Sequence, residues 1–115
     1  LRLFPANPGS KRDAIKWVRS LEAKGYTNIY DAILYGMEDP EVDSIYLYTD
    51  GGASRGIFIK TSEILNFIQR NNEFRKVTLH TIEVPGTSNT KDNIRLLQSL
   101  AEESGGTYQL YEKKK

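Results

Sequence analysis

The sequence contains no cysteine, a single histidine and no long hydrophobic run. Without cysteine the chain can form no disulfide and can perform no thiol chemistry. His80 has no second histidine or cysteine with which to build a nucleophile–base pair, and we expect it to be a hydrogen-bonded core residue. No apolar stretch approaches the roughly 20 residues that span a bilayer. We therefore expect neither a thiol enzyme nor insertion into a membrane.

An excess of one charge is also absent. The chain has 16 basic and 15 acidic residues, a net charge of +1. Such a balance gives no field that would attract nucleic acid or an anionic membrane, and we expect neither as a partner. Neither of the two common glycine-rich phosphate-binding fingerprints occurs.

The length of 115 residues allows one domain at most, and 38% hydrophobic residues allow one modest core. The chain begins Leu-Arg-Leu-Phe rather than with methionine, and we expect it to be a fragment of a longer protein. It contains no targeting signal, so the sequence predicts no compartment.

The first part of the chain predicts two helices. One starts at Ser10, with Asp13 three residues later, and stops at Gly25. The other is capped by Thr27 or Asn28 and ends at residues 39–40 (DP). Each has an apolar stripe typical of a helix that packs on a core. The stripes are Ala14, Trp17, Val18 and Leu21 in the first helix, and Ile29, Ala32, Ile33 and Gly36 in the second.

The rest of the chain alternates strands with helices. Residues 42–49 and 77–84 predict strands rich in β-branched and aromatic residues, and 107–111 predict a third. A helix capped by Thr61 or Ser62 separates the first two strands. The loop 85–89 and a helix from about Lys91 to 105–106 (GG) separate the last two. This order predicts an α/β fold with a doubly wound, mostly parallel sheet, in which the strand at 42–49 is buried on both faces.

The first of these strands ends at Asp50, which Gly51 and Gly52 follow. In open α/β sheets ligands bind at the carboxyl ends of the strands, where Thr27 at a helix entrance could face the same crevice. A hydroxyl and a carboxylate are hard oxygen ligands that suit Mg²⁺, Mn²⁺ or Ca²⁺. Two such ligands do not complete a six-coordinate ion. Asp-Gly is also a simple turn signal, and both interpretations stay open at this point.

Three blocks of the chain resemble the second half of a von Willebrand factor type A domain. They are residues 25–33 (GYTNIYDAI), 45–51 (IYLYTDG) and 100–108 (LAEESGGTY), in that family's order and at about its spacing. The resemblance implies a Rossmann-like fold that carries a metal-ion-dependent adhesion site. On this basis residues 1–115 form one partial domain that lacks the amino-terminal part of the fold.

The resemblance also implies roles for individual residues. Thr27 matches the family's metal-ligating threonine, and Asp50 matches the aspartate that reaches the ion directly or through water. Gly51, Gly52, Ser54 and Asn28 belong to the loops that surround such a site, and Gly56 resembles another small residue there. The implied ion is Mg²⁺ or Mn²⁺, or else Ca²⁺, and a carboxylate of a protein partner completes its coordination.

The chain departs from the family pattern in ways that matter. It has no Asp-x-Ser-x-Ser motif, Tyr26 stands where a glycine is common, and the loop after Gly51 lacks a frequent proline. The metal site is therefore expected to be incomplete in this chain. The resemblance also leaves the strand that ends at Thr49 without its neighbour, which exposes an apolar edge. We expect the chain alone to be unstable, self-associating through this edge or strand-swapped, unless the missing part is supplied in trans.

Three functions are compatible with these residues. The first is a non-enzymatic, adhesion-type protein-binding module that uses a divalent ion. The second is a metal-independent scaffold for assembly, which the absent motif favours. The third is a fragment of a metal-dependent enzyme that acts on phosphate esters or nucleotides. No sequence feature supports this alternative, but it stays open because a fold alone does not define a function.

Overall fold

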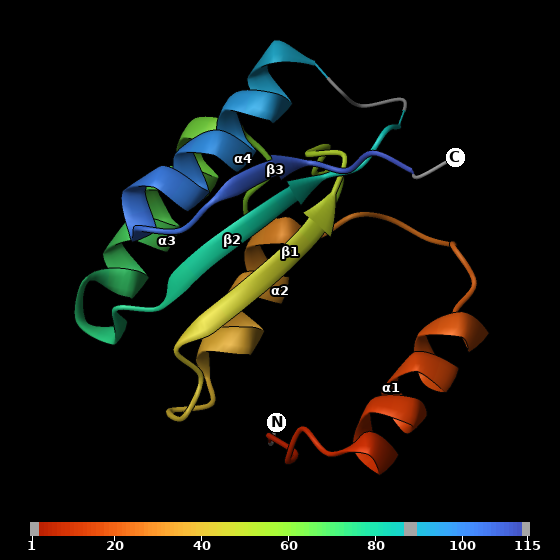
Figure 1. Cartoon of the computed structure of the whole chain (residues 1–115). Coiled ribbons are helices and arrows are strands. Elements are labelled where there is room, and N and C mark those ends of the chain that lie inside the picture. Colours follow the sequence, from red (N-terminus) through yellow and green to blue (C-terminus); the bar gives the residue numbers. More distant parts are fainter. Residues whose placement is uncertain (1–2, 87–89, 114–115) are drawn as a thin grey trace.

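The computed structural model describes residues 3–86 and 90–113 of the chain. In these residues the elements follow the predicted order of two helices and then alternating strands and helices (Figure 1). They are α1 (Pro8–Ser20), α2 (Ile29–Met37), β1 (Ser44–Thr49), α3 (Thr61–Arg75), β2 (Thr78–Glu83), α4 (Lys91–Ser104) and β3 (Tyr108–Leu110). Residues 87–89 of the predicted loop lie outside the described residues.

The three strands form one parallel sheet in the order β1-β2-β3. Tyr46 is opposite His80 in the register of β1 and β2, and Thr81 is opposite Tyr108 in that of β2 and β3. The helices α3 and α4 connect successive strands, as parallel pairing requires. The predicted α/β fold with a parallel sheet flanked by helices is confirmed, and all three strands end at the same edge.

The core lies between one face of the sheet and the helices α2, α3 and α4, which Figure 1 shows behind the strands. Side chains alternate along β2, so that Leu79 and Thr81 are buried while His80 between them is only half-buried. The buried apolar residues of the three helices close this layer: Ile29, Tyr30, Ile33, Met37, Ile64, Ile68, Leu96, Leu97, Leu100 and Ala101. The predicted stripe of α2 is therefore correct at Ile29 and Ile33, whereas Ala32 is exposed.

The prediction that β1 is buried on both faces is wrong. Tyr46 and Tyr48 are 63% and 64% exposed, whereas Ile45 and Leu47 pack on the core. The run is apolar enough to suggest full burial, but every second residue is a tyrosine or serine that tolerates water. In the described residues, helices cover only the face that carries Ile45 and Leu47.

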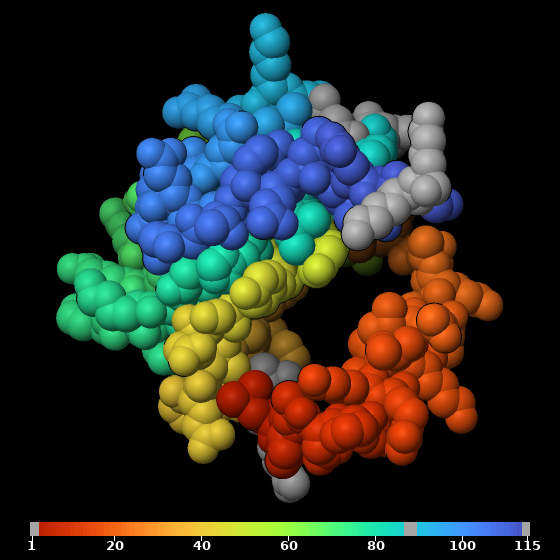
Figure 2. Space-filling model, viewed as in Figure 1, coloured from red at the N-terminus to blue at the C-terminus, as the bar shows by residue number. Residues whose placement is uncertain are grey.

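The first helix differs most from its prediction. It begins at Pro8 because Asn7, not Ser10, is the cap: the Asn7 side chain accepts the Ser10 N–H at 2.8 Å, and proline is favoured at the first helical position. It ends at Ser20, well before Gly25. The expected stripe buries nothing, and Trp17 is 64% exposed. Figure 2 shows open space between α1 and the rest of the molecule.

The remaining helix ends follow simple capping rules. Asn28 caps α2, which settles the choice between Thr27 and Asn28. Neither Thr61 nor Ser62 caps α3: the cap position is Lys60, and the Thr61 hydroxyl instead donates to Asp92 at 2.9 Å. The helix α4 starts at Lys91 and ends at Gly105 in the left-handed conformation, as predicted.

Candidate functional site

The carboxyl edge of the sheet brings together the entrance of α2 and the loop that follows β1. The Thr27 carbonyl accepts the N–H groups of Ser54 and Arg55, at 2.8 and 3.0 Å. The Thr27 N–H in turn donates to the Ser54 hydroxyl at 2.9 Å. Two predicted site residues, Thr27 and Ser54, are therefore in direct contact, although they lie 27 positions apart in the sequence.

Asp50 is half-buried and lies between two loops. Its Oδ1 accepts the Gly52 N–H at 3.0 Å, which is the local turn expected of an Asp-Gly sequence. Gly86, in the loop after β2, lies so close that a Cβ there would be 2.7 Å from Asp50 Oδ2. The turn interpretation of Asp50 is therefore correct as local geometry, and the carboxylate also lies against the neighbouring loop.

Asn28 has a structural task at this edge. Its Oδ1 accepts the Asp31 N–H at 3.1 Å and its Nδ2 donates to the Asp31 carboxylate at 2.6 Å. Gly56 packs on the same amide, where a Cβ would be 2.3 Å from Oδ1. The two small residues predicted in this loop, Ser54 and Gly56, thus fasten it to the start of α2.

Gly51 fixes the other end of the loop. It is buried, has a φ of +85°, and its N–H donates to the Thr49 hydroxyl at 3.1 Å. A Cβ at Gly51 would be 2.7 Å from the carbonyl oxygen of Asn93 in α4. The loop 51–56 is thereby held between α4 and α2, with Asp50 at its start.

The sequence did not point to the cationic rim of this site. The guanidinium carbon of Arg55 lies 4.3 Å from the centre of the Tyr26 ring, and the ring is 68% exposed. A cation over an aromatic ring is a favourable arrangement. Tyr26, which in the sequence is only a departure from a family pattern, therefore positions a positive charge beside Thr27 and Ser54.

The donor set fits a divalent ion only in part. The Thr27 hydroxyl and the Asp50 carboxylate have the right chemistry, but they are two donors. Among residues 3–86 and 90–113, no group of three or more His, Cys, Asp or Glu side chains could hold a metal ion. A six-coordinate ion at this edge would need donors besides these two.

A buried polar layer lies beneath the carboxyl edge. Glu83, at the end of β2, is buried opposite Thr49 and accepts a hydrogen bond from the Tyr108 hydroxyl of β3. The hydrogen bond to Glu83, together with burial and the negative charge of Glu83, raises the pKa of Tyr108 to about 12. The two residues meet because β2 and β3 pair in the sheet, and their separation of 25 positions in the sequence gave no sign of the contact.

This shift predicts a loss of stability in alkali. Tyr108 releases its proton near pH 10 in the unfolded chain but only near 12 in the folded chain, so its contribution is complete below about pH 10 and is lost as the pH rises toward 12. We expect the free energy of unfolding, measured with urea from about pH 8 to about pH 11, to fall as the pH rises. In Tyr108→Phe this decrease with pH should be smaller. Tyr35→Phe, at an exposed tyrosine of α2, is the matched control and should leave it unchanged. An equal pH dependence in Tyr108→Phe and the unaltered chain would contradict the assignment.

His80 is hydrogen-bonded, as expected, but it is not a core residue. Its Nδ1 accepts the Thr107 N–H at 3.1 Å, and its ring stacks on Tyr46 at 4.6 Å on the face of the sheet that the helices leave uncovered. The expectation of a buried position is wrong because His80 shares the outward register of Tyr46.

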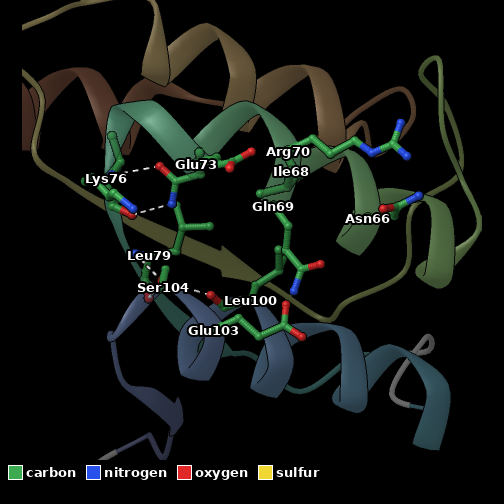
Figure 3. Close-up of a pocket in the computed structure, with 12 residues that line it drawn as sticks. Asn66, Ile68, Gln69, Arg70, Glu73, Lys76, Leu79, Leu100, Glu103 and Ser104 are labelled. Atoms are coloured by element: carbon green, nitrogen blue, oxygen red, sulfur yellow. Dashed lines mark hydrogen bonds between the residues drawn. The ribbon is translucent and has the colours of Figure 1, made fainter.

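A cavity of about 460 Å³ opens at the opposite, amino end of the sheet, between α3 and α4 (Figure 3). Polar side chains in its wall form hydrogen bonds with backbone groups at the start of β2. The Asn72 amide exchanges two hydrogen bonds of 2.7 Å with Val77, and Ser104 accepts the Leu79 N–H at 2.8 Å. The cavity contains none of the predicted site residues, and Asn72 and Ser104 in its wall bond to the backbone of the sheet.

The sequence comparison supports the resemblance. The chain is 32% identical, over 96 residues, to the human (Homo sapiens) protein named von Willebrand factor A domain-containing protein 3A. The match covers 84% of this chain but only 8% of that protein. No protein-family model matches the chain. None of the helices in the described part of the chain has the length and apolar character needed to cross a bilayer.

Proposed function

We propose that this chain is part of a protein-interaction module of the von Willebrand factor A type, with a binding rather than a catalytic role. The similarity to a protein named for that domain supports the assignment. One geometric observation carries the choice of site: the entrance of α2 is hydrogen-bonded, through Thr27 and Ser54, to the loop that begins at Asp50. This is the edge at which α/β sheets bind their ligands.

We further propose that Thr27 and Asp50 take part in binding Mg²⁺ or Mn²⁺, and that the ion engages a carboxylate of a protein partner. Both residues offer hard oxygen donors, and Gly51, Gly52, Ser54 and Asn28 make up the surrounding loops. Because the described residues supply too few donors, further ligands are part of the proposal. They would come from a longer polypeptide, since the match spans a small fraction of the related protein.

Calorimetric titration with Mg²⁺ and Mn²⁺ tests this proposal on two polypeptides. One is this chain, and the other includes about 60 to 80 residues encoded upstream. We expect the longer polypeptide to bind the ion, and expect Asp50→Ala and Thr27→Ala to weaken binding at least about tenfold. Asp43→Ala is the matched control, because Asp43 is an exposed aspartate at the other end of β1. Unchanged affinity in Asp50→Ala would contradict the site, and absence of binding in both polypeptides would contradict the metal mechanism.

A metal-independent interaction is the second candidate, and the pairing of Arg55 with Tyr26 favours it. The guanidinium is a fixed positive charge at the rim of the same site, and could bind an acidic group of a partner without an ion. The two candidates separate in a partner pull-down with EDTA. Loss of the partner in EDTA supports the ion, whereas retention in EDTA and loss in Arg55→Met supports the direct contact.

A further inference from the structure

The cavity between α3 and α4 is formed entirely by α3, α4, β2 and the turn that joins α3 to β2. Its volume of about 460 Å³ lies within the roughly 300 to 1,000 Å³ of cavities that bind small ligands. The inner wall is apolar and consists of the buried residues Ile68, Val77, Leu79 and Leu100. An aliphatic group of a ligand would therefore find apolar neighbours inside.

Three polar side chains at the mouth of this cavity have no partner in the described part of the chain. Gln69 and Glu73 extend from α3, and Glu103 extends from α4. Figure 3 shows the ends of Gln69 and Glu103 directed into the space between the two helices. All three side chains are exposed, and none of them forms a hydrogen bond or an ion pair with another described residue. Their oxygen atoms are therefore available as acceptors to a ligand.

The cavity also lies at the carboxyl-terminal ends of two helices. The helix α3 ends at Arg75 and α4 ends at Ser104, in each case next to residues that line the cavity. The unpaired carbonyl groups of a helix end carry a partial negative charge, which favours cations and disfavours carboxylates. Glu73 and Glu103 nevertheless lie in these last turns, and the last turn of α4 contains no basic residue. A cation bound between them would stabilise both the carboxylates and the helix ends.

Two basic residues belong to the rim, and only one of them opposes this negative charge at the mouth. The guanidinium carbon of Arg70 lies 5.4 Å from the centre of the Phe67 ring, and Figure 3 shows this side chain extending away from Gln69 and Glu103. Lys76 is exposed at the end of the cavity where β2 begins. Two carboxylates and two helix ends therefore outweigh one ammonium group, so the cavity favours a cationic ligand.

We propose that this cavity binds a lysine side chain of a partner protein. The aliphatic stem lies on the apolar inner wall, while the charged group stays at the polar mouth. An ammonium group has three N–H donors, which match the carboxylates of Glu73 and Glu103 and the side-chain carbonyl of Gln69. The backbone of the partner remains outside the mouth. This surface lies at the opposite end of the sheet from Thr27 and Asp50, so it does not depend on the function proposed above.

NMR titration of this chain with the capped tripeptide Gly-Lys-Gly tests the proposal. We expect the amide signals of residues 66–77 and 100–104 to shift, with a Kd in the millimolar range because the probe is small. The capped tripeptide Gly-norleucine-Gly has the same stem without the ammonium group and should bind at least about threefold more weakly. Raising the NaCl concentration from about 0.05 to about 0.5 M should weaken binding of the lysine peptide alone.

Three variants at exposed positions locate the charge that binds the peptide. Glu103→Gln removes one carboxylate of the mouth and should weaken binding of the lysine peptide about three- to fivefold. Glu102→Gln makes the same change one residue away, at an exposed position that does not line the cavity, and is the matched control. It should change the affinity by less than about 1.5-fold. Lys76→Gln removes the opposing positive charge and should strengthen binding.

Four outcomes overturn the proposal. The first is an absence of shifts in residues 66–77 and 100–104 at about 20 mM lysine peptide. The second is equal binding of the lysine and norleucine peptides, because the cavity would then be only an apolar pocket. The third is an equal effect of Glu102→Gln and Glu103→Gln. The fourth is weaker binding in Lys76→Gln together with tighter binding of a capped Gly-Glu-Gly peptide, because the cavity would then select an anion. Circular dichroism verifies that each variant remains folded.

Discussion

Replacing Gly51 by alanine is expected to lower the free energy of unfolding by about 3 kcal/mol. A φ of +85° costs an L-residue about 1 to 2 kcal/mol, and the new Cβ would lie 2.7 Å from the Asn93 carbonyl oxygen. That oxygen belongs to the backbone of α4 and cannot move aside as a flexible side chain would. Urea unfolding measures the loss as a lower midpoint at an unchanged slope.

Gly25→Ala separates the cost of backbone strain from the cost of the steric clash. Gly25 has nearly the same φ, +83°, but no atom lies within 4 Å of the position of its Cβ. Its substitution therefore adds backbone strain alone, and we expect a loss of about 1 to 2 kcal/mol, below that of Gly51→Ala. Equal losses in Gly25→Ala and Gly51→Ala would mean that the loop after Asp50 is not packed on α4 as described.

The order of elements was predictable because it depends on local signals. Thr90 and Gly105 bound α4 within a residue of the predicted limits, since a cap and a left-handed glycine act over a single turn. The strands β1 and β2 follow from runs of β-branched and aromatic residues. Their parallel arrangement follows because a helix lies between each pair of strands.

Burial was predicted less well, because it depends on what surrounds an element. The stripe of Trp17 and Val18 indicates a surface suited to packing, but the pattern does not say which surface covers it, and α1 buries none of its residues. The same reason applies to Tyr46 and Tyr48. An apolar run predicts a strand, whereas the number of covered faces depends on the helices that lie beside it.

The sequence placed the candidate residues at one edge of the sheet but did not predict which of them are in contact. Thr27 and Asp50 follow from motifs and from the edge at which strands end. Arg55 on Tyr26, and Gly86 against Asp50, are contacts set by loop conformation, which spacing does not encode. The loop geometry bonds Thr27 to Ser54 and Arg55 and places Arg55 over Tyr26, so Arg55 is a charge that any account of this edge must include.

Arg75→Met is expected to cost about 3 kcal/mol of stability, because this side chain bonds to three carbonyl groups along the connection between α2 and β1. The guanidinium donates to the carbonyl oxygens of Met37, Asp39 and Val42, at 2.9 to 3.0 Å. Methionine keeps much of the volume but removes all three hydrogen bonds, and of these acceptors the Asp39 carbonyl keeps the Val42 N–H at 3.1 Å. Denaturant unfolding measures the loss, and hydrogen exchange should show weaker protection in residues 42–45.

Two further variants, Arg75→Lys and Arg95→Met, test whether the loss comes from the hydrogen bonds of the Arg75 guanidinium. An ammonium group is compact and lacks the planar fork of arginine, so lysine should recover only part of the loss. Arg95 is exposed on α4, and its replacement by methionine should change stability by less than about 0.5 kcal/mol. If Arg75→Met and Arg95→Met were equally stable, the guanidinium would not be holding the connection. The expected ranking instead makes Arg75 the anchor that sets the position of β1, and hence of Asp50 at its far end.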